Sequence, residues 1–117
     1  MKLIKLWWLI LKTFRTPLFI PLDMKHEPVT EDKLRQFFLS MPPMSYRAEY
    51  QDCDNFAMVY KGIADRETNA VGLVFGWCHG WHLWNMAITE NAVVQIEPQN
   101  GSVFTESKDY RPIIIFV

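Results

Sequence analysis

The sequence predicts an α+β domain in which helices pack on a small antiparallel β-sheet. Apolar residues recur at three- and four-residue spacing through 30–41 and 53–65, which is the period of an amphipathic helix. From residue 71 onward the apolar runs become β-rich and are broken by Gly and Asn turn signals. Helices first and strands afterwards are typical of α+β layering. Half of the 117 residues are apolar, enough for one domain with a buried core.

The first 16 residues predict a basic amphipathic helix that precedes the main domain over 17–117. Their apolar stretch is shorter than the roughly 20 residues that span a membrane, and it lacks the small-residue cleavage site of a signal peptide. Such a helix either packs on the domain, stays poorly ordered, or makes a peripheral membrane contact. Its basic residues gather on one side of the helical wheel: Lys2, Lys5, Lys12 and Arg15.

The boundaries of the two central helices follow from capping residues and prolines. Three prolines within 17–28 predict an extended connector. Thr30 is the expected cap of the first central helix, and the Pro-Pro pair at 42–43 ends it. Asp52 is the expected cap of the second, so Cys53 falls in the first helical turn.

Four β-rich runs follow, and two of them are expected to form a tight hairpin. If residues 90 and 91 make the turn, the numbers of directly opposed residues add up to 181. Side chains alternate between the two faces of a strand, so Glu97 becomes the diagonal neighbour of His82, and Asn85 points to the opposite face. The predicted strands cover residues 71–78, 82–89, 92–98 and 112–117.

Cys53 is the candidate nucleophile. A helix N-terminus favours the thiolate through its unpaired N–H groups and its dipole, whereas the acidic neighbours of Cys53 oppose that form. The plain alternative is a small buried hydrophobic residue. Two cysteines make a poor disulfide framework, so Cys53 and Cys78 are predicted to be free thiols, with a bridge between them as the remaining option.

His82 is the candidate base and Glu97 the candidate orienting carboxylate. A thiolate–imidazolium pair needs an acceptor on the far ring nitrogen, which Glu97 supplies in the expected register. Taken singly, His82 is as well explained as a strand-end histidine and Glu97 as a surface carboxylate. His79, in the glycine-flanked loop before the strand, is the rival base or a substrate contact.

Several neighbouring residues are candidates for secondary roles. Gln51 is placed to help the Cys53 backbone N–H hold an oxyanion. Asp54, Glu97 and Gln99 offer hard oxygen ligands that suit Ca²⁺ or Mn²⁺, although ordinary polar residues near a turn explain them equally. The tryptophans of this region line either a substrate cleft or the core: Trp77, Trp81 and Trp84.

Four short motifs in order carry a resemblance to a known family. They are DCDNFA at 52–57, WHLWN at 81–85, IEPQNG at 96–101 and YRP at 110–112. Over about residues 20–117 the chain resembles small phage-encoded proteins called lectin-related, which are similar to the C-terminal domain of the Marasmius oreades agglutinin. The sugar-binding trefoil of the fungal protein has no counterpart here, so the word lectin does not transfer.

The resemblance implies a papain-like cysteine protease fold with a Cys-His-Glu triad and dependence on calcium or manganese. By position, Cys53 resembles the nucleophile, His82 the base and Glu97 the orienting carboxylate. Gln99, with Asp54 or Asn55, resembles the metal ligands. A bound metal would also offset the acidic residues beside Cys53.

The resulting interpretation is a phage-type cysteine peptidase or thiol hydrolase that acts on a protein or peptide. One alternative is a catalytically silent papain-like module that binds a host or virion protein, and another is a peptidoglycan-directed hydrolase. The expected location is the cytoplasm of an infected bacterium, with membrane or virion association as variants. Twelve basic and thirteen acidic residues give no field that would attract nucleic acid.

Overall fold

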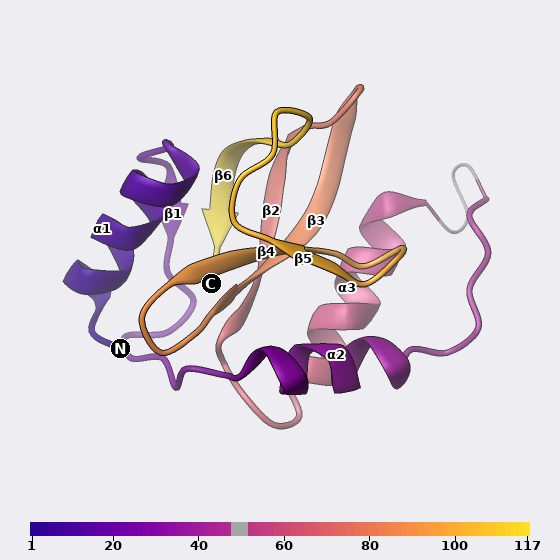
Figure 1. Ribbon diagram of the computed structural model, residues 1–117, viewed down its shortest axis with the longest axis horizontal. Coiled ribbons are helices and arrows are strands. Elements are labelled where there is room, and N and C mark those ends of the chain that lie inside the picture. Colours follow the sequence, from indigo (N-terminus) through magenta and orange to yellow (C-terminus); the bar gives the residue numbers. More distant parts are fainter. Residues whose placement is uncertain (48–51) are drawn as a thin grey trace.

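A six-stranded sheet organises the computed structural model, which describes residues 1–47 and 52–117 (Figure 1). The strand order across the sheet is β1-β6-β2-β3-β4-β5. Three helices accompany it: α1 (Leu3–Phe14), α2 (Glu31–Leu39) and α3 (Cys53–Ala64). The strands are β1 (Phe19–Ile20), β2 (Val71–Trp77), β3 (Trp81–Ile88), β4 (Val93–Glu97), β5 (Ser102–Phe104) and β6 (Arg111–Phe116).

The sheet corrects the expected fold class of helices on a small antiparallel sheet. It is larger than predicted and it is mixed, because β1 pairs in parallel with β6 at one edge. At the other edge β5 adds a short antiparallel partner to β4. Strands of two and three residues have no detectable alternation, so neither was predicted. Figure 1 shows how strongly the sheet twists, with β4 and β5 crossing the direction of β2 and β3.

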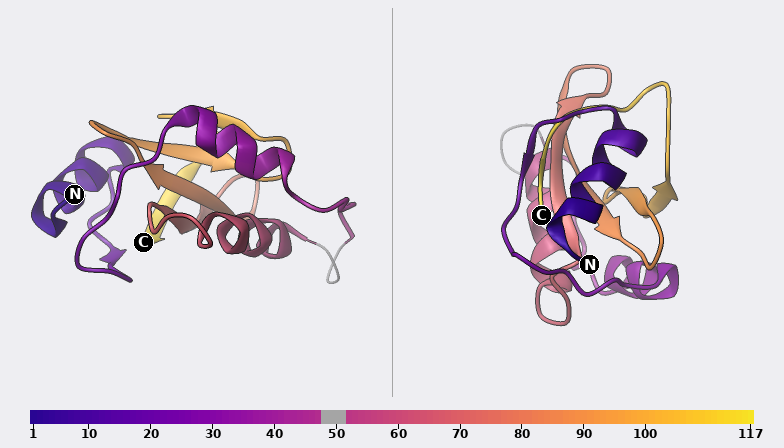
Figure 2. Two further views of the ribbon diagram at one scale, coloured as in Figure 1. Left: turned by 90° about the horizontal axis from the view of Figure 1, so that it is seen from below. Right: turned by 90° about the vertical axis from the view of Figure 1, so that its left-hand side faces the viewer.

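The predicted N-terminal helix is present as α1 and contributes to the core. Leu6, Ile10 and Phe14 are buried on one stripe at three- and four-residue spacing. The stripe packs at the end of the molecule away from α2 and α3, and α1 contacts β4 (Figures 1 and 2). Among the described residues, no helix is long and apolar enough to cross a membrane.

The two central helices confirm the sequence-based helix predictions. The Thr30 side chain accepts a hydrogen bond from the Lys33 backbone N–H at 3.2 Å, which caps α2. The buried Tyr60 hydroxyl donates to the Leu34 carbonyl at 2.8 Å and ties α3 to α2. α3 in turn packs against β3 and β2.

The β3–β4 hairpin has the predicted register. Asn85 pairs with Ile96, Met86 with Gln95 and Ala87 with Val94, and each of these pairs adds up to 181. Residues 90 and 91 form the turn, which the Thr89 N–H closes on the Ala92 carbonyl at 2.9 Å. The register fixes which side chains of the hairpin share a face.

The two faces of β3 meet different partners. Asn85 Nδ2 donates to the carbonyls of Ala57 in α3 and Gly72 in β2, so α3 covers the Asn85 face. Trp84 points the other way, where its indole N–H donates to Gln95 Oε1 at 2.7 Å. Trp84 is fully buried, so it belongs to the core.

Candidate functional site

His82 and Glu97 form a nearly enclosed hydrogen-bonded pair at the open end of the β3–β4 hairpin. His82 Nε2 lies 2.9 Å from Glu97 Oε1, and the two side chains are 12% and 8% exposed. This contact is the diagonal pairing that the hairpin register predicts. The second oxygen of Glu97 is buried without a hydrogen-bond partner among the described residues. The arrangement holds the imidazole in one orientation.

Aromatic rings and a second thiol surround this pair. The His82 ring stacks on Trp84 with 5.5 Å between centroids and lies 6.1 Å from the Tyr110 ring. Burial raises the pKa of the Cys78 thiol, the nearby Glu97 and Asp109 raise it further, and the Tyr110 hydroxyl opposes them. The pKa of Tyr110 is also raised, chiefly by burial. Cys78 is therefore an ordinary protonated thiol at neutral pH.

Cys53 opens α3, as predicted, and is half-buried. Both cysteines are free thiols, as expected. In residues 1–47 and 52–117, no hydrogen bond or ion pair connects Cys53 to His82. Because His82 and Asn85 are an odd number of residues apart, His82 belongs to the sheet face opposite α3. The structure joins two of the three predicted triad residues, and the role of Cys53 stays a prediction.

The remaining predicted residues are dispersed. Gln51 lies outside the described residues. Asp54 is exposed on α3, while Asn55 Oδ1 accepts a hydrogen bond from the Asp52 N–H at 3.1 Å. Gln99 is exposed in the turn after β4. No group of three or more His, Cys, Asp or Glu side chains in the described part of the chain is arranged to hold a metal ion. The metal-ligand set stays a prediction.

Three aromatic side chains at the tip of the β2–β3 hairpin form an aromatic platform: Phe75, Trp77 and Trp81. The Phe75 and Trp81 rings stack at 5.3 Å with an interplanar angle of 8°. Trp77 stands at 81° to Trp81, with 5.4 Å between centroids. They are 38%, 44% and 65% exposed, in chain order, and the hairpin tip projects from the rest of the molecule (Figures 1 and 2).

Two members of this aromatic platform were candidates from the sequence. Trp77 and Trp81 were expected to line either a cleft or the core, and His79 was a possible substrate contact, but Phe75 was not singled out. The signal that could have found it is the alternation of β2, which places Phe75 and Trp77 on one face. His79 lies in the connecting turn with φ of 58°, 3.9 Å from an Asp109 carboxylate oxygen.

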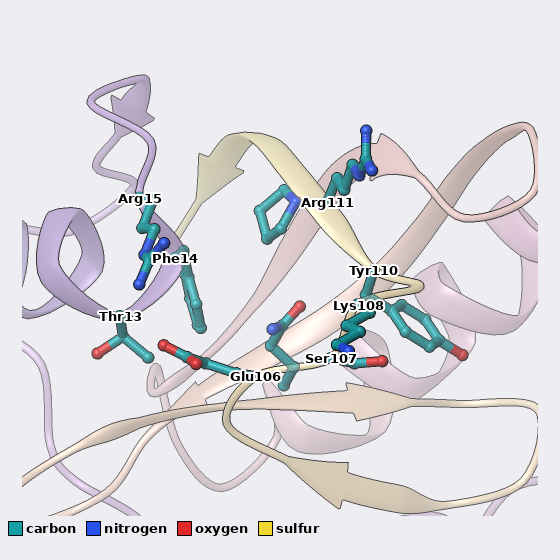
Figure 3. A pocket seen from close by; sticks show the side chains of 10 residues that line it. Thr13, Phe14, Arg15, Glu106, Ser107, Lys108, Tyr110 and Arg111 are labelled. Carbon is teal, nitrogen blue, oxygen red and sulfur yellow. The ribbon is translucent and has the colours of Figure 1, made fainter.

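A groove of about 790 Å³ lies between the end of α1 and the segment 106–112 (Figure 3). Thr13 and Arg15 line the α1 side, and Glu106 reaches toward them from the opposite wall. Ser107, Lys108 and Tyr110 continue that wall. No sequence motif marks this groove, because its two walls are about 90 residues apart in the chain.

Solved structures of the same fold are lectin chains. Neither a search against protein-family models nor one against curated proteins found a match. A complex of PSL1a with E64 matches 100% of this chain with a TM-score of 0.84 and 23% identity. Polyporus squamosus lectin bound to the human-type influenza-binding epitope Neu5Aca2-6Galb1-4GlcNAc matches 97%, with a TM-score of 0.81 and 23% identity. This chain spans 51% and 48% of those chains, about half of their length.

These matches correct the family expected from the four sequence motifs. The matched structures are lectin structures. This chain is mainly sheet, with six strands and three short helices among the described residues, and this fold replaces the expected papain-like protease fold. The interpretations as a phage-encoded cysteine peptidase and as a silent papain-like module are corrected with it. The expected calcium or manganese cofactor stays a prediction.

Proposed function

We propose that this chain is a carbohydrate-binding domain that holds a saccharide on the aromatic platform. The observation that carries the proposal is the right-angled arrangement of Trp81 and Trp77 at an exposed hairpin tip. Exposed aromatic clusters of this kind mark interaction sites on protein surfaces. The partner would be a free glycan or the glycan of a glycoprotein.

The ring geometry suits the apolar face of a sugar. One face of the Trp81 indole is covered by Phe75, and the 65% exposure of Trp81 leaves its outer face to solvent. An aromatic face carries partial negative charge, which attracts the partly positive C–H groups of a pyranose. Trp77 supplies a side wall that restricts how a ring lies on Trp81.

Polar side chains next to the aromatic platform provide partners for sugar hydroxyls. Arg111 pairs with Trp77 in the β2–β6 ladder and therefore lies beside it on the same face. His79 and Asp109 are exposed, and 3.9 Å between them is too long for a hydrogen bond. Their donors and acceptors are thus available to a ligand, which is how polar groups give orientation in a mainly aromatic site.

The comparisons add support at the level of the fold. The fold of this chain occurs within a lectin whose structure was solved with a bound trisaccharide. Carbohydrate binding by this chain is consistent with that match, and the aromatic platform is the surface on which we propose that the saccharide binds.

Binding to a glycan array, followed by calorimetry with the best oligosaccharide, tests the proposal. Trp81→Ala should weaken binding about tenfold or more, because a lost stacking contact of about 0.5–1.5 kcal/mol is accompanied by lost apolar burial. Trp8→Ala is the matched control, since Trp8 is 60% exposed on α1, and it should bind like the wild type. Absence of binding to every saccharide, or equal binding by both variants, would refute the proposal.

A further inference from the structure

We infer that the outer face of α1 binds the surface of an anionic lipid bilayer, with the helix lying in the plane of the membrane. The centre of this outer face is formed by Ile4, Trp8 and Leu11, and two lysines border it. The opposite side of α1 packs on the domain, so the helix can hold the protein on a membrane without leaving the fold. This inference does not depend on saccharide binding by the aromatic platform.

α1 is apolar on two sides, and only one of them faces the core. The buried stripe consists of Leu6, Ile10 and Phe14. Ile4 and Trp8 are 76% and 60% exposed, and they share a second stripe with Leu11 because residues four and seven positions apart return to the same side of a helix. A surface helix normally carries polar residues on the side away from the core. A contact with a second apolar phase explains the exposed stripe.

The segment after α1 continues the exposed apolar surface at the same end of the molecule (Figures 1 and 2). The Trp7 indole N–H donates to the Pro17 carbonyl at 3.4 Å, which holds this segment beside the helix. Leu18 and Ile20 follow, and both are exposed. Single apolar side chains are common on an aqueous surface, whereas a cluster of this extent marks an interaction site.

The part of the chain that carries this surface is strongly basic. Residues 1–22 contain four of the twelve basic residues and none of the thirteen acidic ones. Lys5 and Lys12 are exposed and lie three residues before and four residues after Trp8, so both border it on the helix. In the described part of the chain, neither lysine forms an ion pair. Anionic lipid headgroups are the complementary partner for such a surface.

The residue types are those of a helix at a membrane–water boundary. Tryptophan concentrates there because its ring is apolar and its N–H is polar. Lysine keeps its ammonium among the headgroups while its alkyl chain covers apolar surface. α1 has 12 residues and is therefore about 18 Å long, against the roughly 30 Å of a hydrocarbon core. The geometry that fits is a helix lying along the bilayer surface.

A second copy of the chain is a less suitable occupant of the same face. Pairing two outer faces would bring Lys5 and Lys12 of both copies together, and like charges at short range repel each other. A bilayer with anionic lipids offers the opposite charge over the whole face. Self-association is therefore the alternative that the experiment has to exclude.

Flotation of the full chain with lipid vesicles tests this inference. Vesicles of phosphatidylcholine with about 30% phosphatidylglycerol should bind the protein about tenfold or more tightly than pure phosphatidylcholine vesicles at low salt. The difference should shrink at about 0.3 M salt, because the surface potential is screened. Sedimentation equilibrium without vesicles measures self-association.

Variants on α1 separate the apolar and the basic contributions. Trp8→Ala should lower vesicle binding about tenfold, since the apolar area that the indole buries in the bilayer is lost. Lys5→Gln and Lys12→Gln should each lower binding to the anionic vesicles about fivefold. Arg66→Gln removes an exposed cation elsewhere and should bind like the wild type. All four positions are partly or fully exposed, so the melting curves should stay close to that of the wild type.

Trp81→Ala is the matched control for Trp8→Ala, because the two tryptophans are similarly exposed, and it should bind vesicles like the wild type. If the wild type does not bind anionic vesicles, the inference is wrong. Equal vesicle binding by the two tryptophan variants would also overturn it, because adsorption would then not involve the outer face. A dimer that Trp8→Ala dissociates, without any vesicle binding, would assign this face to a second copy.

Discussion

The His82–Glu97 pair should be a strongly coupled element of stability. Its two side chains are nearly enclosed and lie 2.9 Å apart, and Glu97 has a second buried oxygen that lacks a partner among the described residues. His82→Leu would leave that carboxylate buried next to an apolar side chain. Breaking a buried pair in this way costs about 3–5 kcal/mol, and the exposed fraction of His82 favours the lower end, about 3 kcal/mol.

Removing both partners should cost much less than the sum of the single changes. Replacement of a buried ion pair by apolar residues of similar volume is often neutral, so His82→Leu/Glu97→Leu should be at least as stable as His82→Leu. Urea unfolding at pH 7, followed by circular dichroism, gives the free energy of unfolding for the four proteins in a double-mutant cycle. We expect a coupling energy of about 2 kcal/mol or more.

Two results of this cycle would refute the reasoning. If the two single substitutions add within about 0.5 kcal/mol, the pair is not coupled. If His82→Leu costs less than about 1 kcal/mol, the pair behaves like a surface salt bridge. Tyr60→Phe is a useful reference, because it removes one buried hydrogen bond to the Leu34 carbonyl and should cost only about 1 kcal/mol.

Three further predictions concern pH, thiols and backbone. Burial lowers the pKa of His26 below 6.5 in the folded protein. As the pH falls below 6.5, this histidine is protonated in the unfolded chain before it is protonated in the folded one, so the free energy of unfolding should decrease. The urea midpoints at pH 7.5 and pH 5.5 should therefore differ less in His26→Phe than in the wild type. Cys78, with its raised pKa, should react with iodoacetamide more slowly than Cys53 at pH 7, as measured by peptide mass. Two results would show that Cys53 and His82 act together although no hydrogen bond joins them among the described residues. One is that His82→Ala slows the labelling of Cys53 to the rate of Cys78. The other is that Cys53 binds E64, the compound in the PSL1a complex. Gly101→Ala should lower the melting temperature by several degrees, because Gly101 has φ of 79° and an added Cβ would lie 2.7 Å from the Phe38 ring; an unchanged melting curve would contradict it.

The sequence predicted those parts of the fold that repeat over many residues. The periodic stripes of α2 and α3 and the alternation of β2, β3, β4 and β6 were detectable, and the two-residue turn fixed the register that brings His82 to Glu97. The edge strands β1 and β5 were not detectable, because two or three residues show no period. Because these two strands were not predicted, we expected a small antiparallel sheet where the structure has a mixed six-stranded one.

The candidate site was predictable only where strand pairing determines it. Adjacent strands share a register, so a diagonal contact follows from residue numbers alone. Cys53 belongs to a helix, and no period in the sequence says which face of the sheet a helix covers. Asn85 answers that question in the structure, since its amide bonds to α3 on the face opposite His82. The groove was beyond prediction for the same reason, because only tertiary packing brings Arg15 to Lys108.

The aromatic platform and the groove lie on opposite faces of the sheet. Trp77 shares the face of Asn85, whereas Gln95 of the groove shares the face of Trp84. Arg111 and Pro112 oppose Trp77 and Gly76 in the ladder, just beyond the register shift at Phe75 and Gly76. A bulge re-aims the side chains that follow it, and here it lies within the β2 segment that carries the aromatic platform. A Cβ on Gly76 would clash with the Arg111 carbonyl, so the close approach of the two strands requires glycine. Gly76→Ala should therefore separate β6 from β2 at this point, disturb the position of Trp77 and weaken saccharide binding on the aromatic platform, whereas Trp81→Ala removes one stacking contact.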